Sequence, residues 1–199
     1  KNQINQVGAT ISGGHIRYQA DSVEAGKSSV LAAGIEENGK VREIDDVSET
    51  KNLEIKTAKT TVAKGKNIAS GKVDVQAQTV DVSESQTSGQ DVHIVAHQGE
   101  INANQATLIA KNEINLHTPS QLLTQHANLK ADWINATAQR VENQQGRWAS
   151  QGARDFSLTL EQGLNNEKGL ILSGGNMSLT QQNQFLNNRE GQLLSGKDL

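Results

Sequence analysis

Apolar and polar residues alternate along short stretches of the chain, and these stretches return at a nearly constant interval. Phe156, Leu158 and Leu160 are separated by Ser157 and Thr159, and residues 177–179 repeat the pattern. A period of two is typical of a strand with one buried face. The i, i+3, i+4 spacing of an amphipathic helix is missing from these copies. The pattern therefore predicts strands and disfavours a helical repeat.

The last 59 residues contain three copies of one unit. Gly146, Gly169 and Gly191 lie 23 and then 22 residues apart, and each follows a polar segment that contains Asn. Self-similarity at such a period indicates stacked units rather than one globular core. Gly and Asn tolerate the backbone conformations of tight turns. A unit of about 22 residues with short strands fits one turn of a parallel β-helix.

The same pattern extends, less strictly, to the rest of the chain. Residues 73–77, 92–96 and 114–117 are predicted to be equivalent strands on successive turns, whereas the period is lost across residues 35–66. We therefore expect an all-β fold, a parallel β-helix of roughly nine turns and roughly 43 Å in length at ~4.8 Å per turn. It forms one continuous solenoid: regular turns over 1–34, an irregular turn with a protruding hairpin over 35–66, and regular turns over 67–199.

Composition agrees with a narrow core. Hydrophobic residues are 34% of the chain and aromatic residues 3%, and the net charge is −3. Such a charge predicts no binding to nucleic acid, and no apolar run is long enough for membrane insertion. The chain has no cysteine, which excludes disulfides and thiolate metal sites. Both ends are expected to be cut from a longer protein.

Several segments resemble the filamentous haemagglutinin repeat family. They are the three C-terminal copies and residues 31–35, 38–40, 80–89, 94–101 and 106–110. The resemblance implies a right-handed β-helix from a very large exoprotein of Gram-negative bacteria. It also implies an outer-membrane transporter of the two-partner secretion system as a partner, export through the periplasm, and a final location at the cell surface or in the secreted fraction.

The resemblance leaves the role of the parent protein open between an adhesin or haemagglutinin and a contact-dependent growth-inhibition filament that carries a toxin. In either case this segment is predicted to be a monomeric, non-enzymatic shaft without cofactor or metal. A receptor- or glycan-binding module that uses residues 35–66 is the alternative. A polysaccharide-active β-helix enzyme is a third hypothesis.

Residues 36–51 form the densest charge cluster of the chain, and Asn38-Gly39 within it is a hairpin signal. A recognition surface is one explanation of such a cluster, but a solvated loop is favoured, because charge runs usually face water. In both cases residues 36–50 should project from the shaft, and their deletion should leave the shaft folded. The candidate interaction residues are Glu36, Glu37, Asn38, Gly39, Arg42, Asp45 and Asp46.

Other conspicuous residues have structural explanations. His93 and His97 would lie about 13 Å apart on a strand, too far to share a metal ion. The recurring Asn165-Asn166 and Asn187-Asn188, in register with Asn143, predict a ladder of stacked side chains. Trp133 and Trp148 are expected to cover the side or fill a corner of the column rather than bind a sugar.

Catalytic motifs are missing. No nucleophile elbow, phosphate-binding loop or histidine-anchored triad occurs. Asp74, Asp81, Glu84 and Asp91 could approach one another between turns, as the carboxylates of polysaccharide-active β-helices do, but solvated positions are the favoured explanation, and a cluster of Lys or Arg partners is missing. The sequence predicts no enzymatic function.

Overall fold

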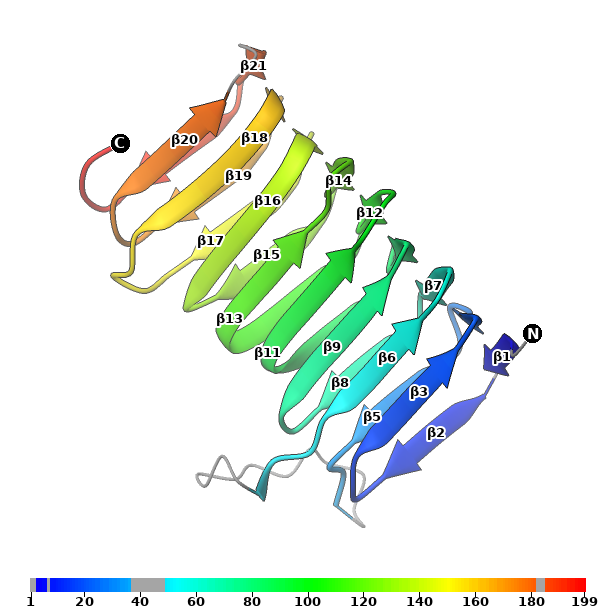
Figure 1. The fold of residues 1–199 in the computed structure, drawn as a ribbon. Coiled ribbons are helices and arrows are strands. Elements are labelled where there is room, and N and C mark those ends of the chain that lie inside the picture. The colour runs from blue at the N-terminus through cyan, green and yellow to red at the C-terminus, as the bar shows by residue number, and fades with distance from the viewer. Residues whose placement is uncertain (1–2, 7, 37–48, 182–184) are drawn as a thin grey trace.

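The structure, a computed structural model, describes residues 3–6, 8–36, 49–181 and 185–199. Its strands coil into a parallel β-solenoid of about eight turns with about 21 residues per turn (Figure 1). The predicted fold class is confirmed. There are slightly fewer turns than the roughly nine expected, because one coil is enlarged: Ile16 pairs with Leu53, 37 residues further on, whereas Val73 pairs with Val92, 19 residues further on.

Three parallel sheets, here called faces A, B and C, run along the solenoid. Face A comprises β3 (Ile16–Ala20), β6 (Leu53–Thr57), β9 (Lys72–Ala77), β20 (Met177–Gln181), the second halves of β11 (Gln86–Ala96) and β13 (Thr107–His117), and the first halves of β16 (Trp133–Glu142) and β18 (Phe156–Asn165). Face B comprises β1 (Gln3–Gln6), β4 (Ser22–Ala25), β7 (Thr60–Ala63), β10 (Thr79–Asp81), β12 (Ile101–Asn102), β14 (Gln121–Leu123), β21 (Leu186–Asn187) and the second halves of β16 and β18.

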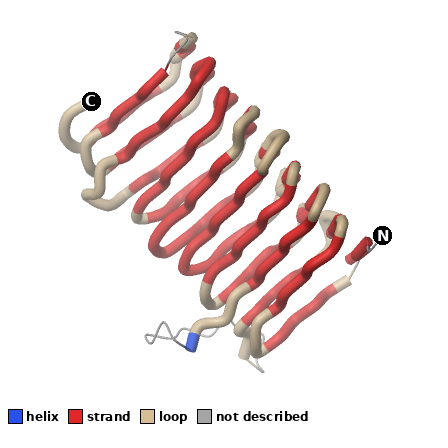
Figure 2. The backbone as a smooth tube through the Cα atoms, viewed as in Figure 1, coloured by secondary structure: helices blue, strands red, loops and turns tan. Residues whose placement is uncertain are grey.

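Face C comprises β2 (Ala9–Ser12), β5 (Val30–Ala33), β8 (Lys66–Ala69), β15 (Asn128–Ala131), β17 (Arg147–Ser150), β19 (Leu170–Ser173), β22 (Gln192–Ser195) and the first halves of β11 and β13. Figure 2 shows that these strands occupy most of each coil outside the enlarged one, with loops at the corners.

The core is a narrow aliphatic column between the three sheets. Every second residue of a strand points inward, as the alternation predicts, so Val73, Val92, Ile114 and Ile134 stack on one another in successive coils. All four are fully buried. One stretch of the column is aromatic, because Trp148 and Phe156 meet edge to face with ring centroids 6.3 Å apart. Each added coil therefore makes the core longer and does not make it wider.

The corner between faces B and C is a tight turn that recurs along the solenoid. In successive coils the backbone N–H of Ser85, Ala106, Ala127 or Gly146 donates to the carbonyl three residues earlier, at 3.0–3.1 Å. The residue before each donor has a positive φ, a conformation that favours Gly and is strained for other residues. None of the six residues concerned is glycine: Glu84, Gln105, His126, Gln145, Lys168 and Glu190. The stacking of the coils holds these residues in that conformation.

The side-chain amides at the first position of these turns form a ladder along the solenoid. Asn143 Nδ2 donates to Asn166 Oδ1, and Asn166 Nδ2 donates to Asn188 Oδ1, each at 2.8 Å. Thr124 continues the ladder by donating from Oγ1 to Asn143 Oδ1 at 2.8 Å. The predicted stacking of the Asn repeats is thus confirmed, and its buried row lies inside the column.

The irregular stretch is shorter than the predicted 35–66. Regular structure resumes at Leu53, because β6 and β7 pair in register with coils on both sides. The alternation was missed there because Thr61 and Ala63 take inward positions that other coils fill with larger aliphatic residues. The hairpin predicted around residues 38–39 lies outside the described residues.

Candidate interaction surfaces

The predicted interaction residues lie in the enlarged coil, between β5 of face C and β6 of face A. Glu36 is half-buried at the end of the described stretch that follows β5. Glu37, Asn38, Gly39, Arg42, Asp45 and Asp46 fall outside the described residues. Whether this cluster binds a partner therefore stays a prediction.

The return from this enlarged coil to the shaft is fixed by hydrogen bonds to neighbouring coils. The backbone N–H of Lys51 donates to Ser70 Oγ, and that of Asn52 to His15 Nδ1, both at 2.9 Å. Asn52 Oδ1 in turn accepts from the backbone N–H of Lys72 at 2.9 Å. These residues border a polar groove at the corner between faces C and A, lined by His15, Thr50, Asn52, Gly71, Lys72, Gln90, Asp91 and Asn112.

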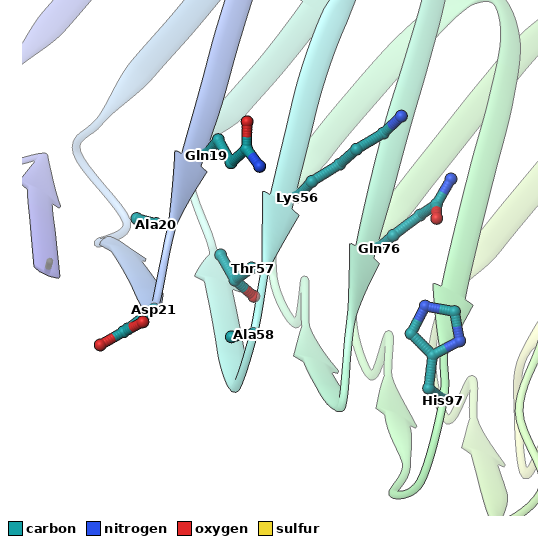
Figure 3. A pocket seen from close by; sticks show the side chains of 8 residues that line it. All are labelled: Gln19, Ala20, Asp21, Lys56, Thr57, Ala58, Gln76 and His97. Carbon is teal, nitrogen blue, oxygen red and sulfur yellow. The ribbon is translucent and has the colours of Figure 1, made fainter. Parts of the chain in front are cut away.

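A second, more open polar pocket lies at the corner between faces A and B (Figure 3). Gln19, Lys56 and Gln76 project from successive strands of face A, and His97 follows at the next coil. Asp21 and Thr57 complete its polar lining. Sequence reasoning missed this pocket, because its residues become neighbours only when coils of unequal length are aligned. Its side chains can donate and accept hydrogen bonds, but they do not form a catalytic arrangement.

The histidines do not form a metal site. His93 Nε2 lies 2.6 Å from Glu113 Oε1 of the next coil, and His97 lies at the corner pocket. No group of three His, Cys, Asp or Glu residues that could hold a metal ion occurs among the described residues. The pairing of His93 with Glu113 was not predicted. The two residues are separated in the sequence by about one coil, and this separation could have indicated that they are neighbours.

The four carboxylates considered for catalysis do not gather at one place. Asp74 lies on face A, with Lys72 Nζ at 3.9 Å and Gln76 Nε2 at 3.2 Å. Asp81 on face B accepts from the backbone N–H of Ser83 at 2.9 Å. Glu84 lies in the turn between faces B and C, where a hydrogen bond from Lys27 lowers the pKa of its carboxyl group. Of the four, only Asp74 and Asp91 share a face, and Lys72 is a neighbour of both: it lies near the Asp74 carboxylate and pairs with Asp91 in the strand register.

The two tryptophans occupy the structural positions expected of them. Trp148 is fully buried and donates from Nε1 to Thr124 Oγ1 at 3.1 Å. Trp133 lies half-buried against the side of the column, where Nε1 donates to the Asp155 carbonyl at 3.0 Å. The Arg154 guanidinium stacks 3.4 Å from the centroid of the Trp133 ring. That face of the ring is therefore already occupied by the chain itself.

The part of the chain that the structure describes contains no helix long and apolar enough to cross a membrane. No protein-family model matches the chain, and no solved structure matches it significantly. Among curated proteins, Toxin CdiA of Yersinia pestis is 31% identical over 175 residues, which cover 88% of this chain. The match spans only 5% of the length of that relative. The chain is thus homologous to a segment of Toxin CdiA, a two-partner-secretion exoprotein with β-helical filament repeats, and the resemblance drawn from its residues is confirmed.

Proposed function

We propose that this segment is a non-enzymatic shaft of a very large secreted bacterial exoprotein. It holds out adhesive or toxin domains toward another cell and does no chemistry itself. The observation that carries the proposal is the continuity of the strand register: apart from the enlarged coil, equivalent residues pair from coil to coil along all three faces. A continuous backbone ladder of this kind gives a stiff rod, and a rod provides reach.

Two further observations support this function. Asp74, Asp81 and Glu84 lie on face A, on face B and in the corner between faces B and C, and each is bonded to its own neighbours, which does not favour a catalytic site. The homologous protein is named as a toxin, and this segment corresponds to a small share of its length. A toxin-bearing growth-inhibition filament is therefore favoured over a haemagglutinin as the parent protein.

The partners follow from this role. The parent chain passes through the periplasm and then through an outer-membrane transporter of the two-partner secretion system. The absence of cysteine is compatible with this route, because no disulfide can form before export. A receptor or glycan on the target cell would be contacted by other parts of the parent protein.

Removing one whole coil from the parent protein tests the shaft role. Deletion of residues 107–127 joins Ala106 to Asn128. Asn128 pairs with Thr107, so it takes the same position in its coil as Thr107 does one coil earlier, and the junction keeps the register. The variant should be exported, should fold, and should retain contact-dependent activity with a reach shorter by ~4.8 Å. Deletion of residues 107–117 is the matched control, because it removes half a coil and breaks the register. Loss of activity in an exported, folded whole-coil variant would refute a passive shaft.

The enlarged coil supports a second candidate, a binding module. The polar groove beside the return of this coil, with Asn52 and Lys72 in its lining, could seat part of a receptor or glycan. The isolated 199-residue chain and a variant without residues 37–48 would be tested for saturable binding to target cells. The shaft hypothesis expects both proteins to fold and neither to bind. Binding by the intact chain that the deletion abolishes would establish the module instead.

A further inference from the structure

Face C carries a row of positions of which most are aliphatic; Ser88 and Lys130 interrupt it, and Ala32 and Ala149 within it are buried. The strand pairing places Ile11, Ala32, Ile68, Ser88, Ile109, Lys130, Ala149, Leu172 and Leu194 in register, one from each successive strand. Among the described residues, Ile11, Ile109 and Leu194 are 60%, 41% and 44% exposed. The row extends over eight steps of ~4.8 Å, or roughly 38 Å.

The charges on face C all have the same sign. Lys66, Lys130 and Arg147 are exposed on it, and none of them forms an ion pair among the described residues. No Asp or Glu occurs in the strands of face C or in the halves of β11 and β13 that belong to it, residues 86–89 and 107–110. The face therefore combines an apolar row with unpaired cations, which is the pattern of a surface that lies on an anionic interface.

The other faces lack this combination, because the strands of face B carry the carboxylates of Glu24, Asp81 and Glu142. Face A carries charges of both signs and two ion pairs: Arg17 with Glu54 at 3.5 Å and Lys72 with Asp74 at 3.9 Å. The outward row that begins at Arg17 continues through Glu54, Asp74, His93 and Asn115 without an aliphatic residue. The apolar, cationic character of face C is thus specific to one side of the solenoid.

We propose that face C docks on an anionic lipid layer. The aliphatic row enters the boundary between headgroups and acyl chains, while Lys66, Lys130 and Arg147 extend toward lipid phosphates. Long basic side chains can place their charge among headgroups while their methylene groups stay on apolar surface. This inference is independent of the shaft role, because a rod can lie on a membrane whether or not it carries another domain.

The geometry disfavours two other occupants. A peptide that adds a strand needs a free sheet edge, but the inner strands of face C are paired on both sides. The hollow between Ile68 and Ile109 is too short to seat an extended peptide. A second copy that stacked antiparallel over the full row would set Lys66 against Arg147. A copy stacked parallel would set each cation against its own equivalent. Both arrangements bring like charges together in an apolar interface.

Vesicle sedimentation tests the charge component. The 199-residue chain should bind vesicles that contain phosphatidylglycerol and should not bind pure phosphatidylcholine. The variant K66Q/K130Q/R147Q should bind about 100-fold more weakly, from about 1 kcal/mol per basic residue near an anionic surface. The matched control R17Q/K56Q/K72Q removes the same charge from face A and should retain its binding. Equal losses in the two variants, or binding to neutral vesicles alone, would overturn the proposal.

A fluorescent label tests the orientation. Because the chain has no cysteine, Ser88→Cys on face C and Thr137→Cys on face A can each be labelled at one site with an environment-sensitive dye. Binding to phosphatidylglycerol vesicles should shift the emission of the Ser88→Cys label to the blue and leave the other label unchanged. Sedimentation without that shift would mean attraction through charge alone, and a shift of both labels would mean unspecific insertion; either result overturns the docking of face C. Retention of the β-rich circular dichroism spectrum confirms that each variant is folded.

Discussion

Replacing Asn166 by aspartate tests how strongly the buried amide ladder stabilises the solenoid. Asn166 is fully buried, and its Nδ2 donates to Asn188 Oδ1 at 2.8 Å, to the Gln192 carbonyl at 3.1 Å and to the Gly169 carbonyl at 3.4 Å. In the Asn166→Asp variant an oxygen faces these three acceptors. The side chain keeps its shape, so the effect comes from hydrogen bonding and charge rather than from a cavity.

The expected destabilisation has two parts. The Asn166 amide has two N–H donors, shared among the three acceptors, and a neutral aspartic acid has one O–H, so about one hydrogen bond is lost, at about 1 kcal/mol. Burial among acceptors also raises the pKa of the new carboxyl group above its unfolded value of about 3.9. Below about pH 4 this difference in pKa does not destabilise the variant. As the pH rises above that value, the free energy of unfolding of the variant falls by about 1.4 kcal/mol per pH unit up to the folded-state pKa. For a folded-state pKa above 6, the total loss at pH 6 should be about 4 kcal/mol.

Urea unfolding of the wild-type chain and the variant at pH 4 and pH 6, followed by far-UV circular dichroism, measures both parts. Asn165→Asp is the matched control one residue away. Asn165 points outward, and its Oδ1 only accepts, from the Glu167 backbone and from Asn187, both at 3.2 Å. That substitution should lower the free energy of unfolding by less than about 0.5 kcal/mol. A loss in Asn166→Asp that is independent of pH, or equal to that of the control, would refute the reasoning.

Three further predictions concern the turns, the core and the surface charges. Gly146→Ala should destabilise the chain by about 1–3 kcal/mol in urea unfolding, because a Cβ would lie 2.1 Å from Asn143 Oδ1; an unchanged midpoint would contradict this. Trp148→Ala should lower the free energy of unfolding by about 3–5 kcal/mol, and the loss of near-UV circular dichroism would accompany it. Lys27 holds the pKa of Glu84 below its ordinary value. The pair therefore stabilises the fold at pH values above the ordinary pKa, and this contribution is lost as the pH falls through the lowered pKa. In a Lys27→Met variant, NMR titration should show the Glu84 pKa returning toward its ordinary value, and a pKa that does not move would assign the shift to another group.

Much of the fold could be predicted because each coil repeats the same local pattern. The Asn pairs are an example: residues that recur every 22 or 23 positions must stack if the units stack, and the buried row of them hydrogen-bonds as expected. The enlarged coil was harder to delimit. Its insertion hides the period, and the small inward residues Thr61 and Ala63 weaken the alternation just where the coil resumes.

The surfaces were less predictable, because they depend on alignment between coils. Outside the enlarged coil, steps between paired residues range from 19 residues at Val73 and Val92 to 23 at Arg147 and Leu170, so side chains that share a row on the solenoid do not share a fixed spacing in the sequence. The row on face C and the His93–Glu113 pair both depend on this register. The positive φ of Lys168 was also hidden, since lysine gives no local signal for that conformation and only the glycine after it marks the turn.

The coil-by-coil construction also determines how the molecule would respond to force. Tension applied at the two chain termini would peel an outermost coil away from its one neighbour while the inner coils stayed paired. Each detached coil of about 21 residues releases roughly 70 Å of slack polypeptide, far more than the axial length it gives up. The molecule would thus lengthen in successive steps and dissipate work at each one, as a tether does when two joined cells are pulled apart.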